Sequence, residues 1–131
     1  MRKEELIGNA MAAMKNAYAP YSKYTVGAAL LGVSGEVYFG CNVENSSYGA
    51  TNCAERTAIY NAISRGEQEF CAIAIVGGKG GRVERYCPPC GICRQVLSEF
   101  CGENFRIYLY DGKEIKTYTL GEMLPQSFSM R

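Results

Sequence analysis

Three stretches of the chain repeat their hydrophobic residues at the spacing of an α-helix. The first runs from Lys3 to Ala17 and ends at Ala19-Pro20. The second runs from Cys53 to Arg65, and the third opens at Pro88-Pro89. The positions expected to face the core are, in chain order, Leu6, Ile7, Ala10, Met11, Met14 and Ala17, then Ala58, Ile59, Ala62 and Ile63, then Ile92, Val96, Leu97 and Phe100. We therefore expect three helices that each pack one side against a core.

Shorter runs of small apolar, β-branched and aromatic residues predict five strands. The predicted strands span Thr25–Val33, Glu36–Val43, Phe70–Val76, Phe105–Tyr110 and Glu114–Thr119. Ser34-Gly35 separates the first two strands, and Asp111-Gly112 separates the last two. Both dipeptides are typical of tight turns, so each pair is predicted to be an antiparallel hairpin.

The segments between these elements are polar or rich in glycine. Asn45–Asn52 has the composition of a loop, with Asn52 placed to cap the second helix. Gly77–Tyr86 is predicted to be a glycine-rich surface loop, and Met123–Arg131 is too short to assign. No repeat or domain boundary interrupts the pattern, so we expect one domain over residues 1–131. The order α-β-β-α-β-α-β-β predicts an α/β fold with helices packed on a five-stranded sheet.

Charge argues against a nucleic-acid partner. The chain has 131 residues with 14 Lys and Arg against 13 Asp and Glu, a net charge of +1. Its densest basic stretch holds only Lys79, Arg82 and Arg85, interrupted by Glu84. Because nucleic-acid-binding proteins usually carry a pronounced basic face, this balance favours a small, nearly neutral partner.

Cysteine usage indicates a reducing compartment. The seven cysteines are an odd number, and the polar residues Met1 to Glu5 do not begin a targeting segment. No apolar run approaches the ~18 residues of a membrane span. We therefore expect a soluble cytoplasmic protein with reduced thiols and no membrane partner.

The candidate chemistry lies in Cys53-Ala54-Glu55 and Pro89-Cys90-Gly91-Ile92-Cys93, in a chain without histidine. Both groups begin a helix, where free N–H groups and the helix dipole favour thiolates. Three thiolates hold Zn²⁺ with one position open, as catalytic zinc sites require. Glu55 would then reach whatever binds at the open position. Since the usual histidine base is missing, we expect the chemistry of the site to depend on a metal ion assisted by a carboxylate.

Cys87-Pro88-Pro89-Cys90 offers a rival pair with the same spacing. The two prolines lack the N–H groups that such a pair points at sulfur, so we predict Cys90 and Cys93 as ligands and Cys87 as a spare thiol. A structural zinc would need a fourth ligand, such as Cys87 or a carboxylate. Cys41, Cys71 and Cys101 are predicted to be small buried side chains.

In these motifs the chain resembles the cytidine deaminases, in particular the small homotetrameric type with three cysteine zinc ligands. The zinc-deaminase signature is a first ligand followed by x-Glu, and then P-C-x-x-C. The likeness extends through Ala17–Ser22, Val26–Ala29, Gly40–Asn45 and Leu124-Pro125, nearly the whole chain. It implies a three-layer α-β-α cytidine-deaminase-like fold with a mixed five-stranded sheet.

The resemblance also implies an activity, which is hydrolytic deamination of cytidine and deoxycytidine to uridine and deoxyuridine plus ammonia in pyrimidine salvage. It implies one Zn²⁺ per subunit, zinc-bound water as the nucleophile, and Glu55 as the proton shuttle. Arg56 matches an arginine that hydrogen-bonds the ligand sulfurs. The resemblance implies that Asn42 and Glu44 contact the ribose 3′-hydroxyl. Tyr24, at a position where the family usually has Phe, and Ala54 are further implied substrate contacts. Tyr48 and Phe128 are implied to contact the substrate from neighbouring subunits of a homotetramer.

Other functions stay open at this point. The chain could deaminate another base or a nucleoside analogue, be a zinc-stabilised binding module, or be a thiol-disulfide oxidoreductase built on Cys87 and Cys90. The Asp111-Gly112 turn makes the last two strands antiparallel, as in nucleoside deaminases, whereas nucleic-acid editors resemble a version with a helix between a parallel pair.

Overall fold

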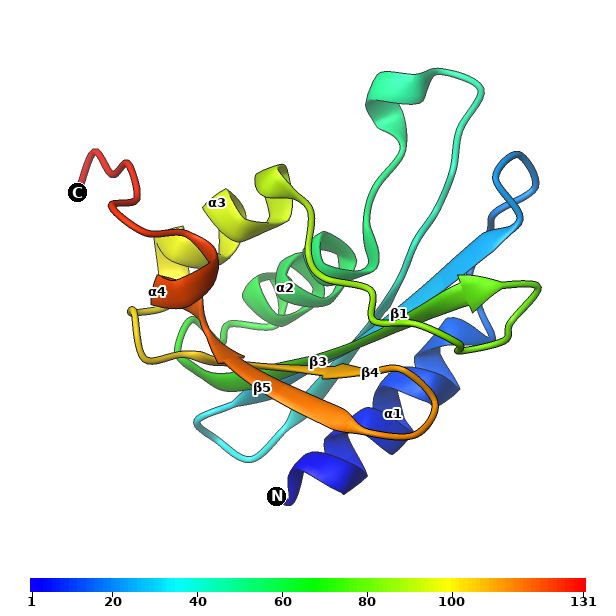
Figure 1. The fold of residues 1–131 in the computed structure, drawn as a ribbon. Helices are drawn as coiled ribbons and strands as arrows, with labels where there is room; N and C mark the ends of the chain where they lie inside the picture. The colour runs from blue at the N-terminus through cyan, green and yellow to red at the C-terminus, as the bar shows by residue number, and fades with distance from the viewer.

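A computed structural model describes residues 1–131, and its centre is one mixed sheet (Figure 1). Across the sheet the strand order is β2-β1-β3-β4-β5. The strands are β1 Tyr24–Gly32, β2 Val37–Cys41, β3 Phe70–Lys79, β4 Arg106–Tyr110 and β5 Ile115–Thr119. The helices are α1 Lys3–Met14, α2 Ala54–Ser64, α3 Gly91–Phe100 and α4 Leu120–Met123, with a 3-10 turn η1 at Tyr48–Ala50.

The pairing of the strands confirms both predicted hairpins. β1 pairs antiparallel with β2 and with β3, and β3 pairs parallel with β4. β4 and β5 are antiparallel, with Tyr110 opposite Ile115. Their turn is stabilised by Asp111, whose Oδ1 accepts from the N–H groups of Lys113 and Glu114, and by Gly112 at a φ of 97°.

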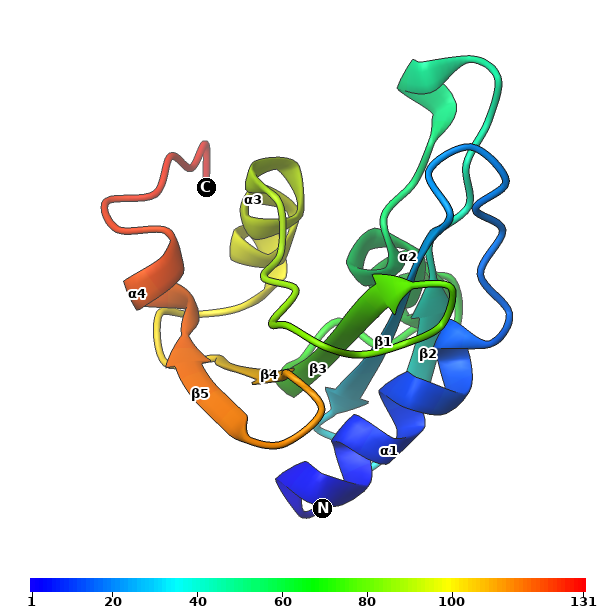
Figure 2. The same ribbon diagram turned by 45° about the vertical axis from the view of Figure 1, so that its right-hand side comes forward.

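Helices cover both faces of the sheet, which gives the predicted three layers (Figure 2). α1 packs on one face over a core that includes Leu6, Met14 and Val76. α2 and α3 lie on the other face over a larger core that includes Ile59, Leu97 and Ile107. The residues of β3 from Ala72 to Gly78 are all buried, because this central strand is covered on both sides.

Gly40 of β2 determines how closely α2 approaches the sheet. A Cβ at this position would lie 2.2 Å from the carbonyl oxygen of Ala54 and 2.4 Å from the backbone nitrogen of Ala58. Only glycine therefore allows the first turn of α2 to rest directly on the strand. This contact fixes the helix end that carries Cys53.

Two predicted boundaries are wrong for reasons of tertiary structure. Gly77 and Gly78, expected in a surface loop, continue β3 as far as Lys79 because Tyr24, Thr25 and Val26 supply strand partners. The cap of α2 is Cys53 rather than Asn52, whose side chain instead donates to Thr57 Oγ1 at 3.2 Å.

Three side chains expected in the core are exposed. Met11 is 37% exposed, because Ala10, Ala13 and Met14 occupy the buried face of α1. Ile92 is 61% exposed, because Cys93 and Leu97 occupy the inward face of α3 four residues apart. Cys71 is also exposed. β3 begins opposite a register shift between Leu31 and Gly32, so Cys71 lies just outside the buried part of the strand. Cys41 and Cys101 are partly buried.

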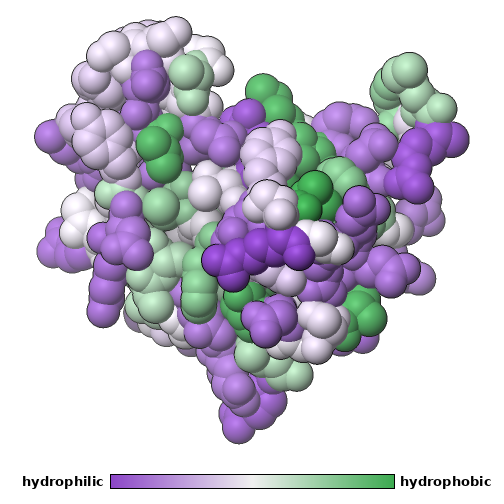
Figure 3. All heavy atoms as spheres, turned by 180° about the vertical axis from the view of Figure 1, so that it is seen from behind, coloured by the Kyte–Doolittle hydropathy of each residue, from purple (hydrophilic) through white to green (hydrophobic).

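The surface mixes side chains of opposite character. Figure 3 shows hydrophilic groups over much of one face with smaller hydrophobic groups between them. Tyr48 and Phe128 are among the large apolar side chains most open to solvent, at 86% and 69% exposure. None of the helices is both long enough and apolar enough to cross a membrane.

Candidate metal centre

Two helix N-termini bring three cysteines together. Cys53 is the cap residue of α2, and Cys90 is the cap residue of α3. Cys93 lies in the first turn of α3, and its backbone N–H donates to the sulfur of Cys90 at 3.4 Å. Both helices lie on the same face of the sheet (Figure 1). The positive ends of two helix dipoles therefore meet at one group of thiols.

The spacing of the sulfurs suits a zinc ion. The Sγ atoms of Cys53 and Cys90 are 3.7 Å apart, and those of Cys90 and Cys93 are 3.3 Å apart. All three ligand atoms lie within 4.8 Å of one another. Tetrahedral Zn²⁺ with Zn–S bonds of about 2.3 Å places its sulfurs roughly 3.8 Å apart. The donor set is also the soft one that zinc favours.

The electrostatics of the cluster favour thiolate at Cys53. The neighbouring thiol of Cys93 lowers the pKa of Cys53 to about 5, and Arg56 contributes in the same direction. The Nη2 atom of Arg56 donates to the sulfur of Cys53 at 3.3 Å. The same interaction with Cys53, together with burial, raises the pKa of Cys93. The negative charge of the cluster is therefore favoured on Cys53, next to the guanidinium of Arg56.

Glu55 is the buried carboxyl of the site. It follows Cys53 in the first turn of α2 and is only 4% exposed. Burial, with a smaller contribution from the charge of Cys53, raises the pKa of Glu55 to about 7. A carboxyl group with this pKa can accept and return a proton near neutral pH.

Arg56 leaves one polar atom without a partner. Its Nε is buried and makes no hydrogen bond. Its contacts with Cys53 and Cys93 raise the pKa of the guanidinium, which therefore stays charged. Unpaired buried donors are rare in folded proteins. This one lies beside the sulfur cluster, where it adds positive charge.

Asn42 holds the start of β1, and Glu44 holds the loop that precedes it. Asn42 Nδ2 donates to the carbonyl oxygen of Tyr24, and Asn42 Oδ1 accepts from the N–H of Val26, both at 2.8 Å. Glu44 Oε1 accepts from the N–H groups of Tyr21 and Ser22.

Burial, with a contribution from Cys87, raises the pKa of the phenol of Tyr24.

The remaining predicted contacts lie at three places. Ala54 is fully buried at the start of α2. Tyr48 lies on η1 and lines a cavity of about 350 Å³ together with Glu44. Phe128 lies against α3, where Gln95 Nε2 donates to its carbonyl oxygen at 3.0 Å.

Cys87 stands apart from the sulfur cluster. Burial raises its pKa to about 11, which keeps it a neutral thiol. The group of three candidate metal ligands comprises Cys53, Cys90 and Cys93 without Cys87. All seven cysteines are free of disulfide bonds.

Arg94 is a residue that the sequence reasoning missed. Its Nε donates to the carbonyl oxygen of Pro89, and its Nη1 donates to that of Met123, both at 2.8 Å. It thereby ties the segment that carries Cys90 to the C-terminal part of the chain. The sequence signal was its position directly after Cys93.

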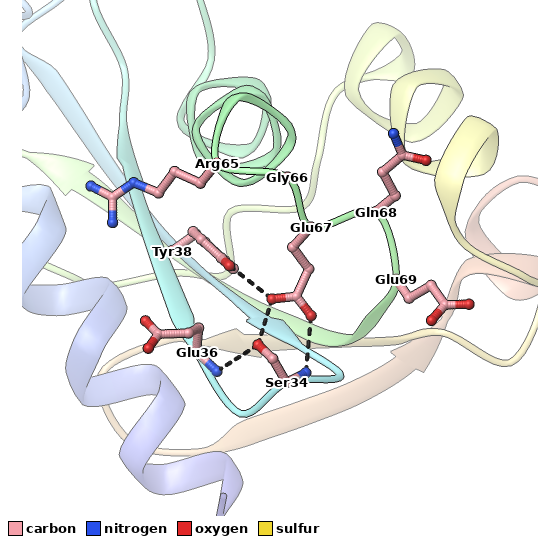
Figure 4. A pocket seen from close by; sticks show the side chains of 8 residues that line it. All are labelled: Ser34, Glu36, Tyr38, Arg65, Gly66, Glu67, Gln68 and Glu69. Atoms are coloured by element: carbon pink, nitrogen blue, oxygen red, sulfur yellow. Dashed lines mark hydrogen bonds between the residues drawn. The ribbon is translucent and has the colours of Figure 1, made fainter.

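A further polar pocket lies near the C-terminal end of β1 (Figure 4). It measures about 690 Å³ and is lined by residues 34, 36, 38 and 65–69. Glu67 accepts hydrogen bonds from the N–H and hydroxyl of Ser34 and from the hydroxyl of Tyr38. This carboxylate therefore ties the loop after α2 to the β1–β2 hairpin.

Comparison with known proteins agrees with this zinc-binding α/β architecture. The family model described as "Cytidine and deoxycytidylate deaminase zinc-binding region" matches residues 1–109. A cytidine deaminase of Sporosarcina psychrophila is 48% identical over 127 residues, covering 96% of this chain and 90% of that protein. A cytidine deaminase of Halalkalibacterium halodurans is 45% identical over 130 residues, covering 98% and 96%.

Solved structures give the same result. The crystal structure of cytidine deaminase from Burkholderia pseudomallei matches with a TM-score of 0.90 and 44% identity, covering 98% of this chain and all of that one. This chain therefore belongs to the cytidine deaminase family. The zinc-binding region of the family and the three clustered cysteines fit one Zn²⁺ per chain.

Proposed function

We propose that this protein catalyses the hydrolytic deamination of cytidine and deoxycytidine, giving uridine and deoxyuridine plus ammonia. The observation that carries the proposal is a buried carboxyl, Glu55, adjoining a cluster of three thiols. The family to which the chain belongs agrees with it. We place the protein in the cytoplasm, in pyrimidine salvage, as a single catalytic domain.

Cys53, Cys90 and Cys93 would hold the zinc ion. When bound, Zn²⁺ supplies a Lewis acid that lowers the pKa of water toward neutrality. Three thiolates on Zn²⁺ leave a net charge of −1, which weakens that effect. Arg56, through its bond to Cys53, and the two helix N-termini draw charge away from the sulfurs and offset it.

Glu55 moves the protons. Its carboxylate takes a proton from the attacking water as the new C–O bond forms at C4, and it delivers that proton to ring N3. It then transfers the remaining hydroxyl proton to the amino nitrogen, the C4–N bond breaks, and ammonia leaves. Every proton in this sequence lies near C4, so one carboxyl serves all steps.

Asn42 and Glu44 would bind the ribose 3′-hydroxyl. They lie two residues apart on an extended segment, an arrangement that directs both side chains the same way. After its two bonds to β1, the Asn42 amide retains one N–H for a ligand. Tyr24 would contact the substrate with its ring, and Ala54 is a further contact.

A free nucleoside suits this chain better than a base within nucleic acid. The net charge is only +1, far from the basic character that a polynucleotide requires. The antiparallel pairing of β4 and β5 is the arrangement that we associate with nucleoside deaminases.

We further propose a homotetramer whose active sites are completed by neighbouring subunits. Tyr48 and Phe128 are aromatic side chains at 86% and 69% exposure, and each is available to a second copy of the chain. Aromatic residues of this kind are enriched in protein interfaces.

Ammonia release from cytidine, deoxycytidine, adenosine and single-stranded DNA tests the proposed substrate directly. We expect release from the first two compounds and none from the others. Glu99→Gln serves as the matched control for Glu55→Gln in this assay, because Glu99 is an exposed carboxylate on α3. Turnover of adenosine or DNA in preference to cytidine would overturn the assignment.

A further inference from the structure

Glu44 is held by one short loop. Its Oε1 accepts from the backbone N–H groups of Tyr21 at 3.0 Å and Ser22 at 3.1 Å. Its Oε2 is bonded to the hydroxyl of Ser22. These bonds lower the pKa of Glu44 and keep it ionised. Ser22 thus contacts both oxygens of this carboxylate.

The direction of the Ser22 hydroxyl follows from its other contact. Ser22 Oγ accepts from the backbone N–H of Tyr24 at 3.0 Å. An ionised carboxylate can only accept, so the hydroxyl proton of Ser22 is donated to Glu44. The carbonyl oxygen of Tyr24 in turn accepts from Asn42. Ser22 is the link that joins Glu44 to Tyr24 and, through Tyr24, to Asn42.

The carboxylate of Glu44 has one hydrogen-bond acceptor position left for a ligand. A carboxylate offers about four lone-pair positions, two on each oxygen. The three donors from Tyr21 and Ser22 occupy three of them, including both on Oε1. One position remains, on the oxygen that the Ser22 hydroxyl touches. Glu44 can therefore accept one ligand hydroxyl, from a direction that Ser22 helps to set.

The backbone between Ser22 and Tyr24 is fixed in an unusual conformation. Lys23 has a φ of 62°, in the left-handed region that side-chain-bearing residues rarely adopt. Its N–H donates to the carbonyl oxygen of Ala19, and its carbonyl oxygen accepts from the N–H of Gly80, both at 3.0 Å. Such conformations persist only where the surroundings enforce them. The turn is thus built to place Ser22 against Glu44, and both line the cavity of about 350 Å³.

We propose that Ser22 is a positioning residue that determines recognition of the ribose 3′-hydroxyl by orienting Glu44. The inference rests on the proposed function, because Glu44 contacts the sugar only if the substrate is a nucleoside. Ser22 itself need not touch the substrate. Its effect should depend on the presence of that one hydroxyl group.

The test compares cytidine with 3′-deoxycytidine. We expect Ser22→Ala to raise KM for cytidine about tenfold more than KM for 3′-deoxycytidine, the factor that corresponds to one hydrogen bond to a charged group. Ser22→Thr keeps the hydroxyl and should restore the wild-type ratio. Ser46→Ala is the matched control, since the Ser46 hydroxyl pairs with Tyr21 at 2.7 Å without contacting Glu44.

The outcomes separate this proposal from the proposed function. If Glu44→Gln loses its preference for the 3′-hydroxyl but Ser22→Ala keeps it, the role of Ser22 is refuted while the activity stands. Equal losses on both substrates, or a lowered thermal midpoint that accounts for the loss, would likewise refute it. If the wild-type protein does not deaminate cytidine, both proposals fall.

Discussion

At the scale of single residues, the character of Glu55 comes from its place in the fold. A carboxyl at the start of a helix would ordinarily ionise easily, because the helix dipole favours the anion. Here burial outweighs that effect and raises the pKa to about 7. The side chain can therefore carry a proton in either direction near neutral pH.

Replacing Glu55 by Gln should separate catalysis from metal binding. The amide keeps the size of the side chain but cannot shuttle a proton, so kcat should fall by at least about a thousandfold. Zinc content by elemental analysis should stay near that of the wild type. Substantial residual deamination in Glu55→Gln would remove Glu55 from the mechanism.

Arg56 should affect turnover more than metal content. Its guanidinium donates to the sulfur of Cys53 but is not itself a ligand. Loss of such an outer contact typically costs roughly 10–100-fold in activity or metal affinity. We expect Arg56→Ala to lower kcat within that range while most of the zinc is retained, as measured in the same samples. Unchanged turnover would contradict the role given to Arg56.

At the scale of elements, the contact between Gly40 and α2 places Cys53. In Gly40→Ala the new methyl group would press on the backbone of Ala54 and Ala58, which cannot move aside as a flexible side chain would. Overpacking of this kind costs about 1–3 kcal/mol. We expect a lower unfolding midpoint in denaturant. Gly8→Ala is the control, because a Cβ there meets no atom within 4 Å; equal effects of the two changes would contradict this account.

Glu67 should make stability depend on pH at the acid side. Hydrogen bonds from Ser34, and a further one from Tyr38, lower its pKa in the folded protein (Figure 4). Because the folded pKa lies below the unfolded value of about 4.3, this stabilisation is complete above that value. It is lost as pH falls through the folded pKa.

Thermal unfolding across an acid pH series measures this effect. Glu67→Gln should lower the midpoint at pH 7 and flatten the decline toward low pH. Glu69→Gln is the matched control, since Glu69 lines the same cavity but points away from Ser34 (Figure 4). If both variants follow the wild-type curve, Glu67 does not link hairpin and loop as described.

The sequence predicted the elements whose signals are local. Helical spacing and two turn dipeptides were sufficient for three helices and two hairpins. The continuation of β3 through Gly77 and Gly78 could not be predicted, because it depends on partners more than 50 residues away in β1. The exposure of Ile92 was equally hidden, since it depends on which side of α3 faces the sheet.

Within the site, spacing predicted the three cysteines that the structure brings together. The bonds that connect Ser22 to Glu44 and Tyr24 left no such signal. They depend on a left-handed turn at Lys23, and a lysine in the sequence does not predict that conformation as a glycine would. The bonds that orient Glu44 could therefore be found only in the folded structure.

At the scale of the whole molecule, exposed aromatic side chains predict assembly. We expect analytical ultracentrifugation to give four times the chain mass of 14.4 kDa. Phe128→Ala should raise KM for cytidine while leaving zinc content unchanged, because the ring would serve a neighbouring site. A fully active monomer would contradict the shared active site.

We propose that one zinc ion, held by Cys53, Cys90 and Cys93 beside Glu55, gives this protein its cytidine deaminase activity. This role of zinc is tested by measuring zinc stoichiometry and cytidine turnover on the same purified sample before and after chelation. We predict one zinc per chain, loss of turnover on removal of the metal, and recovery when zinc is returned. Protein that contains no metal, or that deaminates cytidine at full rate without it, would contradict the account.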